Sequence, residues 1–285
     1  MEGMGITAGY ECCKCFINQI DKVIKIAGKG IDEKKKIEIF KKSIEFLSKL
    51  EFSVTPPEIA QQIYSYLNFL LKNDDPFKEI KDKTNELALN IAKEIFSEEL
   101  SLKEALKYAI CGNVIDFGIG DKNFSFSEIK NINFLIFEFE KFYEFLKKTK
   151  QLLYIVDNSG EIIFDRLLIS IIKKNFPDIR IIVAGREKPV INDITYEELY
   201  KLKFNEFSEI ISTGFSGPGV PLNKVSDDFK NVFKSSDLII SKGQGNFETL
   251  WNLKKENIFF GLKIKCEHVS KATKIPVGSN IFTNF

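Results

Sequence analysis

This 285-residue chain has little histidine, no excess of charge and no long apolar run, and each of these absences argues against a class of function. Histidine occurs once, at His268, so a Ser–His triad or a phosphohistidine mechanism would have to rest on that residue. The 41 Lys and Arg residues nearly balance the 40 Asp and Glu residues, which argues against general binding of nucleic acid. No uncharged apolar stretch reaches the roughly 18 residues of a transmembrane helix. The opening MEGMGITAGYECC lacks the basic and apolar regions of a secretory signal.

Cysteine is also too scarce and too unevenly spaced for a disulfide framework. The chain has five cysteines, an odd number, and three of them crowd together at positions 12, 13 and 15. This pattern favours a reducing, cytoplasmic location. Cys12 and Cys15 would share one face of a helix, and Cys266 could complete a thiol-rich site. Two interpretations stay open, namely buried unliganded thiols and a second metal or redox site, with a disulfide ranked last.

The first half of the sequence has a helical pattern. In KKKIEIFKKSIEFLSKL and the segments that follow, apolar residues recur at steps of three and four. The segment SLKEALKYAI begins with Ser101 as an expected N-cap and with Glu104 in the capping-box position. The Phe-rich stretch NFLIFEFEKFYEFL, residues 133–146, is predicted to be a core helix that could form an oligomer interface. This half is therefore expected to be helical throughout.

After residue 150 the pattern changes to short apolar runs separated by amphipathic stretches. The runs are LLYIV, IRIIVAG, EIISTG, DLIISKG and IFFGLKI. Continuous apolar runs are typical of parallel strands that are covered on both faces. Their alternation with helical segments predicts an α/β fold with a doubly wound, mostly parallel sheet. We predict a helical domain over residues 1–148 and an α/β domain over residues 149–285, packed together as one unit.

Polar residues follow the predicted strands at their carboxyl ends, where such sheets bind ligands. Asp157 and Asn158 follow the first strand, and Asp193 follows the second. Two carboxylates and an amide oxygen suit Mg²⁺ or Mn²⁺ better than zinc. Lys242 and Gly243, after the fourth strand, are groups that would bind a phosphate. This set predicts phosphoryl transfer or hydrolysis, although Asp157 and Asn158 could instead cap the next helix.

Several blocks of the sequence resemble the damage-control phosphatase family, also known as domain of unknown function 89. The blocks, in order, are ECCKCFINQ, CGNVIDFG, DNSGEIIFD, REKPVIND, SKGQGNFE and LKIKCEHV. The Cys-x-x-Cys pair is similar to that of the stand-alone prokaryotic and archaeal subgroup. The resemblance implies a helical N-terminal part followed by a Rossmann-like α/β part that binds a metal and a phosphate.

The resemblance also implies an activity and a set of site residues. Family members hydrolyse phosphate monoesters of small metabolites, including sugar phosphates and phosphopantetheine derivatives, with manganese, magnesium, cobalt or nickel. The metal ligands fall on Asp157, Asn158 and Asp193, of which Asp157 and Asp193 are the expected catalytic residues. The implied substrate contacts are Asn113, Asp116, Lys242, Gly243, Asn246 and Lys265. The expected partner is thus a small phosphorylated metabolite, with a homo-oligomer as a further expectation.

The nucleophile and the class of protein each leave alternatives open. Asp157 could attack to form an aspartyl-phosphate, or a metal-activated water could attack directly. Glu161 would orient that water and contact the substrate, or it would only complement the helix dipole. The rival classes are a methyltransferase that uses S-adenosylmethionine to modify carboxyl groups, a non-enzymatic metabolite or metal sensor, and a subunit of a larger assembly. The absence of a GxGxxG motif after the first strand weakens a dinucleotide-binding interpretation.

Overall fold

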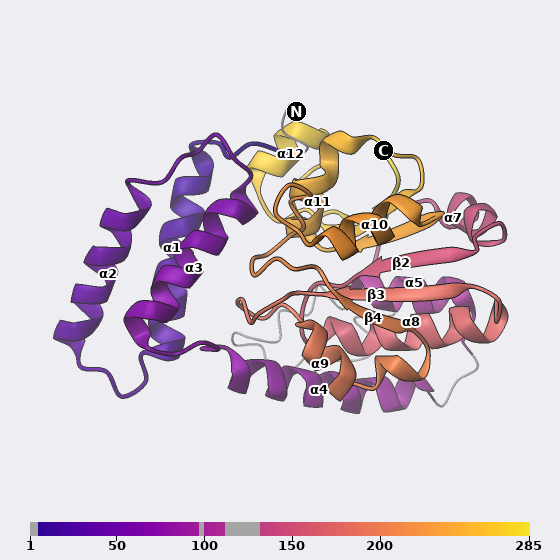
Figure 1. Cartoon of the computed structure of the whole chain (residues 1–285), viewed down its shortest axis with the longest axis horizontal. Coiled ribbons are helices and arrows are strands. Elements are labelled where there is room, and N and C mark those ends of the chain that lie inside the picture. The colour runs from indigo at the N-terminus through magenta and orange to yellow at the C-terminus, as the bar shows by residue number, and fades with distance from the viewer. Residues whose placement is uncertain (1–4, 97–99, 112–131) are drawn as a thin grey trace.

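A computed structural model describes residues 5–96, 100–111 and 132–285 of the chain (Figure 1). Within these ranges five helices precede the first strand. They are α1 (Glu11–Ala27), α2 (Glu33–Leu47), α3 (Pro56–Leu71), α4 (Lys78–Phe96) and α5 (Leu102–Cys111). The predicted capping box at α5 is confirmed, because the backbone N–H of Ser101 donates to Glu104 at 2.9 Å and that of Glu104 donates to Ser101 at 3.3 Å. No described helix is long and apolar enough to cross a membrane.

The strands form one sheet of seven, in the order β1-β7-β6-β5-β2-β3-β4. They are β1 (Phe134–Phe137), β2 (Gln151–Ile155), β3 (Arg180–Gly185), β4 (Glu209–Ser212), β5 (Leu238–Lys242), β6 (Ile258–Lys263) and β7 (Asn280–Thr283). All neighbours run parallel except β6 and β7. The predicted α/β class is therefore confirmed, and all five predicted strands are present as β2 to β6.

The prediction of a single helix over residues 133–146 was wrong. This stretch forms the edge strand β1, which pairs with β7, and only then the helix α7 (Phe139–Leu146). A short run of apolar and aromatic residues fits a strand as well as a helix, and the open edge of β7 decides between them. The first half of the chain thus contributes a strand to the sheet, and a domain division at residue 148 stays a prediction.

Helices cover both faces of the sheet (Figure 1). The helices after β2 are α8 (Glu161–Asn175), α9 (Tyr196–Lys201), α10 (Asp227–Ser235), α11 (Gln244–Leu250) and α12 (Glu267–Thr273), with short 3₁₀ turns at Phe204–Glu206 and Trp251–Leu253. On β2, Leu152 and Tyr154 pack against the face that holds α4, α5, α7 and α8. Leu153 and Ile155 pack against the opposite face, which holds α10, α11 and α12. Burial on both faces explains why this strand has no polar alternation.

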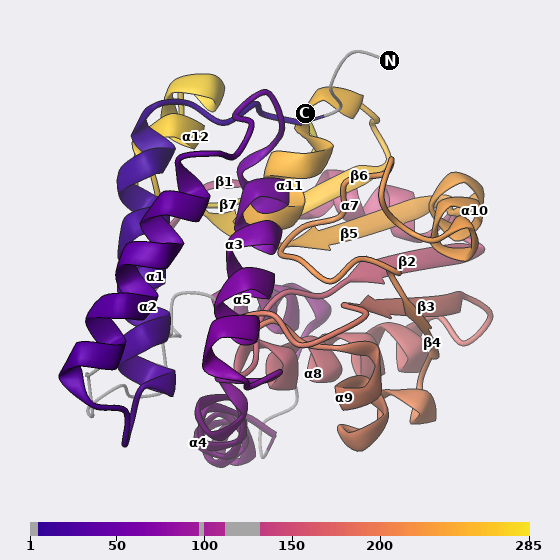
Figure 2. The same cartoon turned by 60° about the vertical axis from the view of Figure 1, so that its left-hand side comes forward.

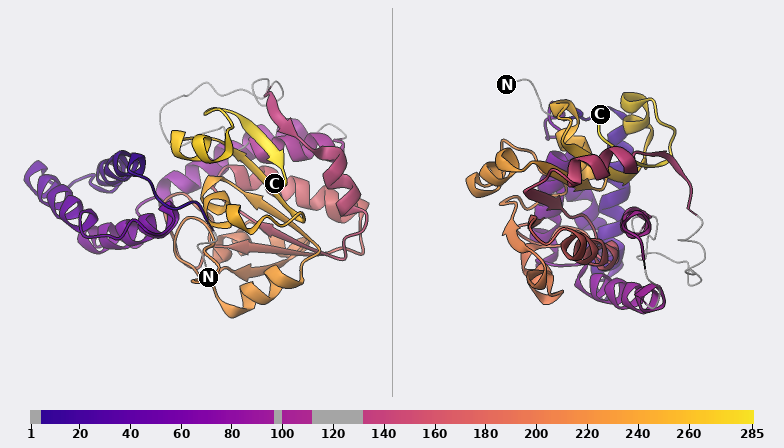
Figure 3. Two further views of the ribbon diagram at one scale, coloured as in Figure 1. Left: turned by 90° about the horizontal axis from the view of Figure 1, so that it is seen from above. Right: turned by 90° about the vertical axis from the view of Figure 1, so that its right-hand side faces the viewer.

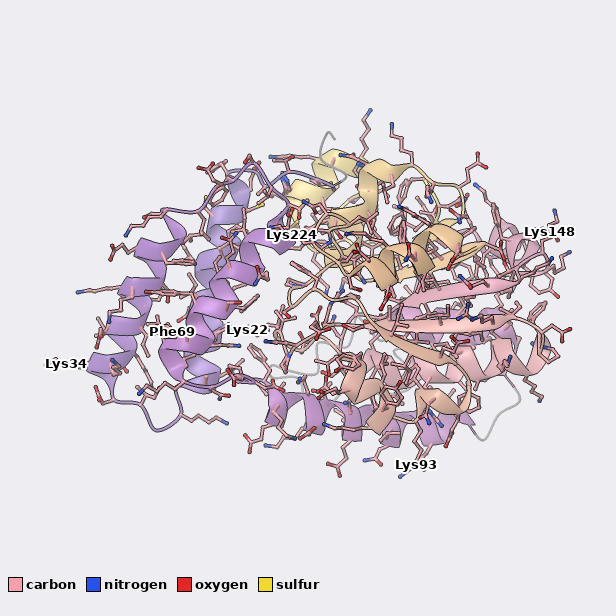
Figure 4. The ribbon with its side chains drawn as sticks, viewed as in Figure 1. Lys22, Lys34, Phe69, Lys93, Lys148 and Lys224 are labelled. Carbon is pink, nitrogen blue, oxygen red and sulfur yellow. The ribbon has the colours of Figure 1, made fainter. Side chains whose placement is uncertain are left out.

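The helices α1, α2 and α3 build a separate apolar core beside the sheet, around residues such as Phe16 and Leu67. Seen from above, they extend to one side of the sheet and its covering helices (Figure 3). Val190, from the loop after β3, inserts into this core. Lys224, from the loop after β4, pairs with Glu58 of α3 at 3.1 Å and lies between α3 and the sheet (Figure 4). Through these contacts α3 and the core of the three helices meet the loops at the carboxyl edge of the sheet, and the helices stand on that side of the sheet in Figure 2.

The topology marks one position on this edge as special. From β2 the chain proceeds to β3 and β4 on one side, whereas from β5 it proceeds to β6 and β7 on the other side. Because β2 and β5 are neighbours, the direction of winding reverses between them. Ligands of open α/β sheets bind at such a switch point, beyond the carboxyl ends of the strands. The residues that follow β2 and β5 are therefore the first candidates for a functional site.

Candidate active site

The backbone brings the three predicted metal ligands together at the switch point. Asp157 and Asn158 follow β2, and Asp193 lies in the loop after β3. Asn158 and Asp193 form an isolated antiparallel bridge, and the N–H of Ile194 donates to the carbonyl of Asp157 at 2.9 Å. Both aspartate side chains are buried. The alternative prediction, that Asp157 or Asn158 caps the next helix, was wrong. The N-cap residue of α8 is Gly160.

The turn that presents Asp193 contains a strained residue. The N–H of Asp193 donates to the carbonyl of Val190 at 3.0 Å, which closes a tight turn. Within it Ile191 has φ 41°, in the left-handed region that β-branched residues rarely adopt. Such strain costs about 1–3 kcal/mol and persists only where surrounding contacts enforce it. Here Val190 is part of the core of α1 to α3, and Ile191 itself packs against that core.

A buried arginine that the sequence analysis did not select lies at the centre of the site. Arg186 follows β3 and is 1% exposed. Its Nε donates to Oδ2 of Asp193 at 2.8 Å, and its NH2 lies 3.7 Å from Oδ1 of Asp157. Its NH1 donates to Oδ1 of Asn246 at 2.8 Å and to the carbonyl of Gly219 at 2.9 Å. The sequence feature that could have identified Arg186 is its position directly after an apolar strand, at the start of the block REKPVIND.

The charge state of Asp193 reflects these neighbours. Burial raises the pKa of its carboxyl group to about 6, the Arg186 guanidinium opposes that rise, and the nearby Asp157 adds to it. The positive charge of Lys265 also acts to lower this pKa, so the ammonium group of Lys265 is close enough to influence the site. The Lys265 side chain is exposed, and the backbone N–H of this residue donates to Oε1 of Gln244 at 2.8 Å. The charge of Lys265 thus acts on the side of the site where Asp193 lies.

Lys242 and Glu161 do not face the carboxyl edge of the sheet, where the sequence analysis expected a phosphate and a water to bind. Both side chains are fully buried between the sheet and α8. The Nζ of Lys242 donates to the carbonyl of Ala109 at 2.6 Å, to Asp165 at 2.8 Å and to Glu161. The hydroxyl of Tyr154 also donates to Asp165, at 2.5 Å. An ammonium group has three hydrogens, so Lys242 has none left for a substrate phosphate.

The group of Lys242, Glu161 and Asp165 places two carboxyl groups beside one ammonium group in the protein interior. Burial raises the pKa of both carboxyl groups, and the adjacent Lys242 ammonium opposes that rise. The expectation that Glu161 orients a water at the site has no support in this geometry. Its role is to balance the charge of Lys242 beneath the site.

Gly243 and Asn246 give the site its shape. Gly243 has φ 79°, and a Cβ atom at this position would lie 1.9 Å from Oδ2 of Asp157. Only glycine therefore lets the turn after β5 approach the Asp157 carboxylate. The buried Asn246 donates from Nδ2 to the carbonyls of Val156 at 3.1 Å and Lys242 at 2.7 Å, while its Oδ1 accepts from Arg186. Its contacts hold neighbouring segments together.

The donor set fits a hard divalent cation by its chemistry. Asp157 and Asp193 supply carboxylate oxygens, and Asn158 supplies an amide oxygen while its Nδ2 donates to Asp157 at 2.7 Å. In the described part of the chain no group of three or more His, Cys, Asp or Glu side chains is placed to hold a metal. The expected metal ligands are therefore two carboxylates and one amide oxygen. The predicted contacts Asn113 and Asp116 lie outside the described residues.

The three cysteines of the predicted second site lie near one another in the fold. Cys12 and Cys15 are on α1, and Cys266 is the N-cap residue of α12, where its sulfur lies 3.4 Å from Nε2 of Gln244. None of these cysteines forms a disulfide. Burial raises the pKa of the Cys12 thiol to about 11 and also raises those of Cys15 and Cys266, which makes them weak nucleophiles at neutral pH. In the described part of the chain these three cysteines are not placed to hold a metal, and a redox role stays a prediction.

Glu248 of α11 gives a testable pH dependence. Burial raises the pKa of its carboxyl group from 4.5 to about 7, with Gln244 donating to it at 2.9 Å. The unfolded state ionises first, so the free energy of unfolding should fall as pH rises from about 4.5 through 7. Glu248→Gln should therefore match the wild type near pH 4.5 and exceed it by about 1–3 kcal/mol at pH 8.

Urea unfolding at the two pH values measures this difference. Glu256→Gln, at an exposed position, is the matched control and should leave both curves unchanged. Equal stability of Glu248→Gln and wild type at pH 8 would contradict the prediction.

Comparison with known proteins places the chain in a family. The family described as damage-control phosphatase ARMT1-like domain matches residues 8–281, and the chain belongs to it. A damage-control phosphatase of Pyrococcus horikoshii is 37% identical over 277 residues, which cover 95% of each chain. A protein of Archaeoglobus fulgidus named damage-control phosphatase is 30% identical and covers 78% of this chain and 80% of its own.

A solved structure supports the same assignment. The crystal structure of a Pyrococcus horikoshii protein of the DUF89 family superposes with a TM-score of 0.91 at 35% sequence identity. The match covers 98% of this chain and 99% of the other. The predicted family and fold class are thus confirmed, and the similarity extends through both halves of the chain.

Proposed function

We propose that this protein is a divalent-metal-dependent phosphatase that hydrolyses phosphate monoesters of small metabolites, such as sugar phosphates or phosphopantetheine-like compounds. Membership of a family whose relatives are named damage-control phosphatases supports the reaction class. One observation supports the metal dependence. Asp157, Asn158 and Asp193 come together at the switch point of the sheet through direct backbone pairing.

The donor set fits manganese, magnesium, cobalt or nickel, which Asp157, Asn158 and Asp193 would hold. A cation bound there would supply positive charge to the phosphoryl group. The exposed Lys265 would bind a second phosphoryl oxygen, because its charge already acts on Asp193. Asp157 as a ligand is a poor nucleophile, so we favour attack by water. Lys242 and Glu161 have a positioning role in this proposal, beneath the turn that carries Gly243.

A screen of phosphorylated metabolites tests the proposed function. Protein freed of metal by a chelator would be assayed with each substrate, alone and with Mn²⁺, Mg²⁺, Co²⁺ or Ni²⁺. We expect release of phosphate from at least one monoester only when metal is added, and loss of that activity with excess EDTA. Reactions without protein are the control for release by the metal itself. Hydrolysis that is unchanged by EDTA would refute the metal dependence, and no hydrolysis of any monoester would refute the activity.

A further inference from the structure

The most connected side chain of the site is not one of its expected ligands. Arg186 contacts residues that follow four different strands, namely Asp157 after β2, Asp193 after β3, Gly219 after β4 and Asn246 after β5. We propose that Arg186 is a positioning residue that fixes the Asp193 carboxylate for cation binding. This inference rests on the proposed function, because it assigns a role toward the same metal site.

The contact with Asp193 uses one carboxylate oxygen and leaves the other for a ligand. The Nε of Arg186 donates to Oδ2 at 2.8 Å, which fixes the plane of the carboxylate. A charge-assisted hydrogen bond between two buried groups is strong and directional. Groups that hydrogen-bond a metal ligand in this way orient it and tune its affinity for the metal.

The guanidinium is itself held in place from the opposite side. Its NH1 donates to Oδ1 of Asn246 at 2.8 Å and to the carbonyl of Gly219 at 2.9 Å. Because the guanidinium is planar and rigid, fixing NH1 also fixes the direction of Nε. The loop after β4 and the helix α11 thereby determine where the Asp193 carboxylate points.

The third nitrogen of the guanidinium is buried and has no hydrogen-bond partner among the described residues. This nitrogen, NH2, lies 3.7 Å from Oδ1 of Asp157, beyond hydrogen-bonding distance. A buried unpaired N–H is destabilising, and buried polar groups of folded proteins are rarely left in this state without a functional reason. At this distance NH2 offsets the negative charge of Asp157 without a direct hydrogen bond to its Oδ1.

A purely structural arginine would stabilise the fold without affecting metal affinity. The test therefore measures the binding of Mn²⁺ alone by titration calorimetry, beside thermal unfolding of the metal-free protein. Arg186→Lys keeps the charge, but a single ammonium cannot reproduce the planar fork. We expect its dissociation constant for Mn²⁺ to rise by about 10- to 100-fold. Arg180→Lys, at the opposite end of β3, is the matched control. Arg180 pairs with Glu209 at the surface, so the Mn²⁺ affinity of this variant should be unchanged.

Wild-type Mn²⁺ affinity in Arg186→Lys would overturn the inference. If that variant does not fold, Asn246→Ala removes one acceptor of NH1 while it keeps the arginine, and unchanged Mn²⁺ affinity there would overturn it equally. The proposed function fails separately, if wild-type protein binds Mn²⁺ but hydrolyses no phosphate monoester. In that case the affinities of the variants still decide the role of Arg186.

Discussion

Replacing Asp193 with asparagine is expected to abolish metal-dependent hydrolysis while it leaves the fold intact. The asparagine side chain has the same shape as that of aspartate. Its amide oxygen can still accept from the Nε of Arg186, which donates to Asp193 at 2.8 Å in the wild type. The substitution removes the negative charge that a cation requires. Loss of electrostatic stabilisation at a phosphoryl site should lower kcat/KM by about 10²- to 10³-fold or more. Steady-state kinetics with the best substrate of the metabolite screen would measure this.

The stability of the same variant gives an independent check. Burial raises the pKa of Asp193 to about 6, so its ionised form at neutral pH is less stable in the protein than in water. Asp193→Asn should therefore unfold at the same temperature as wild type or higher, as expected where function opposes stability. Asp228→Asn, at an exposed position of α10, is the control and should retain full activity. Turnover at the wild-type rate by Asp193→Asn would refute the assignment of this ligand.

Lys242→Met is expected to have the largest effect on stability. It removes the only positive charge in the group of Lys242, Glu161 and Asp165, so two carboxylates remain buried without compensation. Breaking a buried ion pair from one side costs about 3–5 kcal/mol. Urea unfolding at pH 7.5 should show a loss of that size. Lys201→Met, at an exposed position of α9, should change the free energy of unfolding by less than about 0.5 kcal/mol.

A double variant distinguishes the structural role of Lys242 from the phosphate contact that the sequence predicted. Lys242→Met combined with Asp165→Asn removes one of the two uncompensated charges, so it should recover part of the lost stability. If Lys242 instead contacted the substrate phosphate, Lys242→Met would raise KM and leave the free energy of unfolding unchanged. That outcome would overturn the structural assignment of Lys242.

The sequence by itself determined five of the seven strands of the sheet and the meeting of Asp157, Asn158 and Asp193 at one edge. Continuous apolar runs define β2 to β6, and parallel strands bring their carboxyl ends to one edge. Asp157 and Asn158 after one strand and Asp193 after the next had to meet there. Local sequence is enough for this prediction, because a residue that directly follows a parallel strand lies at the carboxyl edge of the sheet. The motif blocks likewise identified the family that matches residues 8–281.

The tertiary structure alone decided which charged side chains face inward. Lys242 continues the face of β5 that carries Leu238 and Ile240, so its side chain points toward α8 instead of the rim. Its partners, Glu161 and Asp165, are 81 and 77 positions away along the chain. Whether a charge is buried depends on partners of this kind, which local pattern does not reveal. The same holds for Arg186, whose contacts come from three loops and the helix α11, which meet only in the folded sheet.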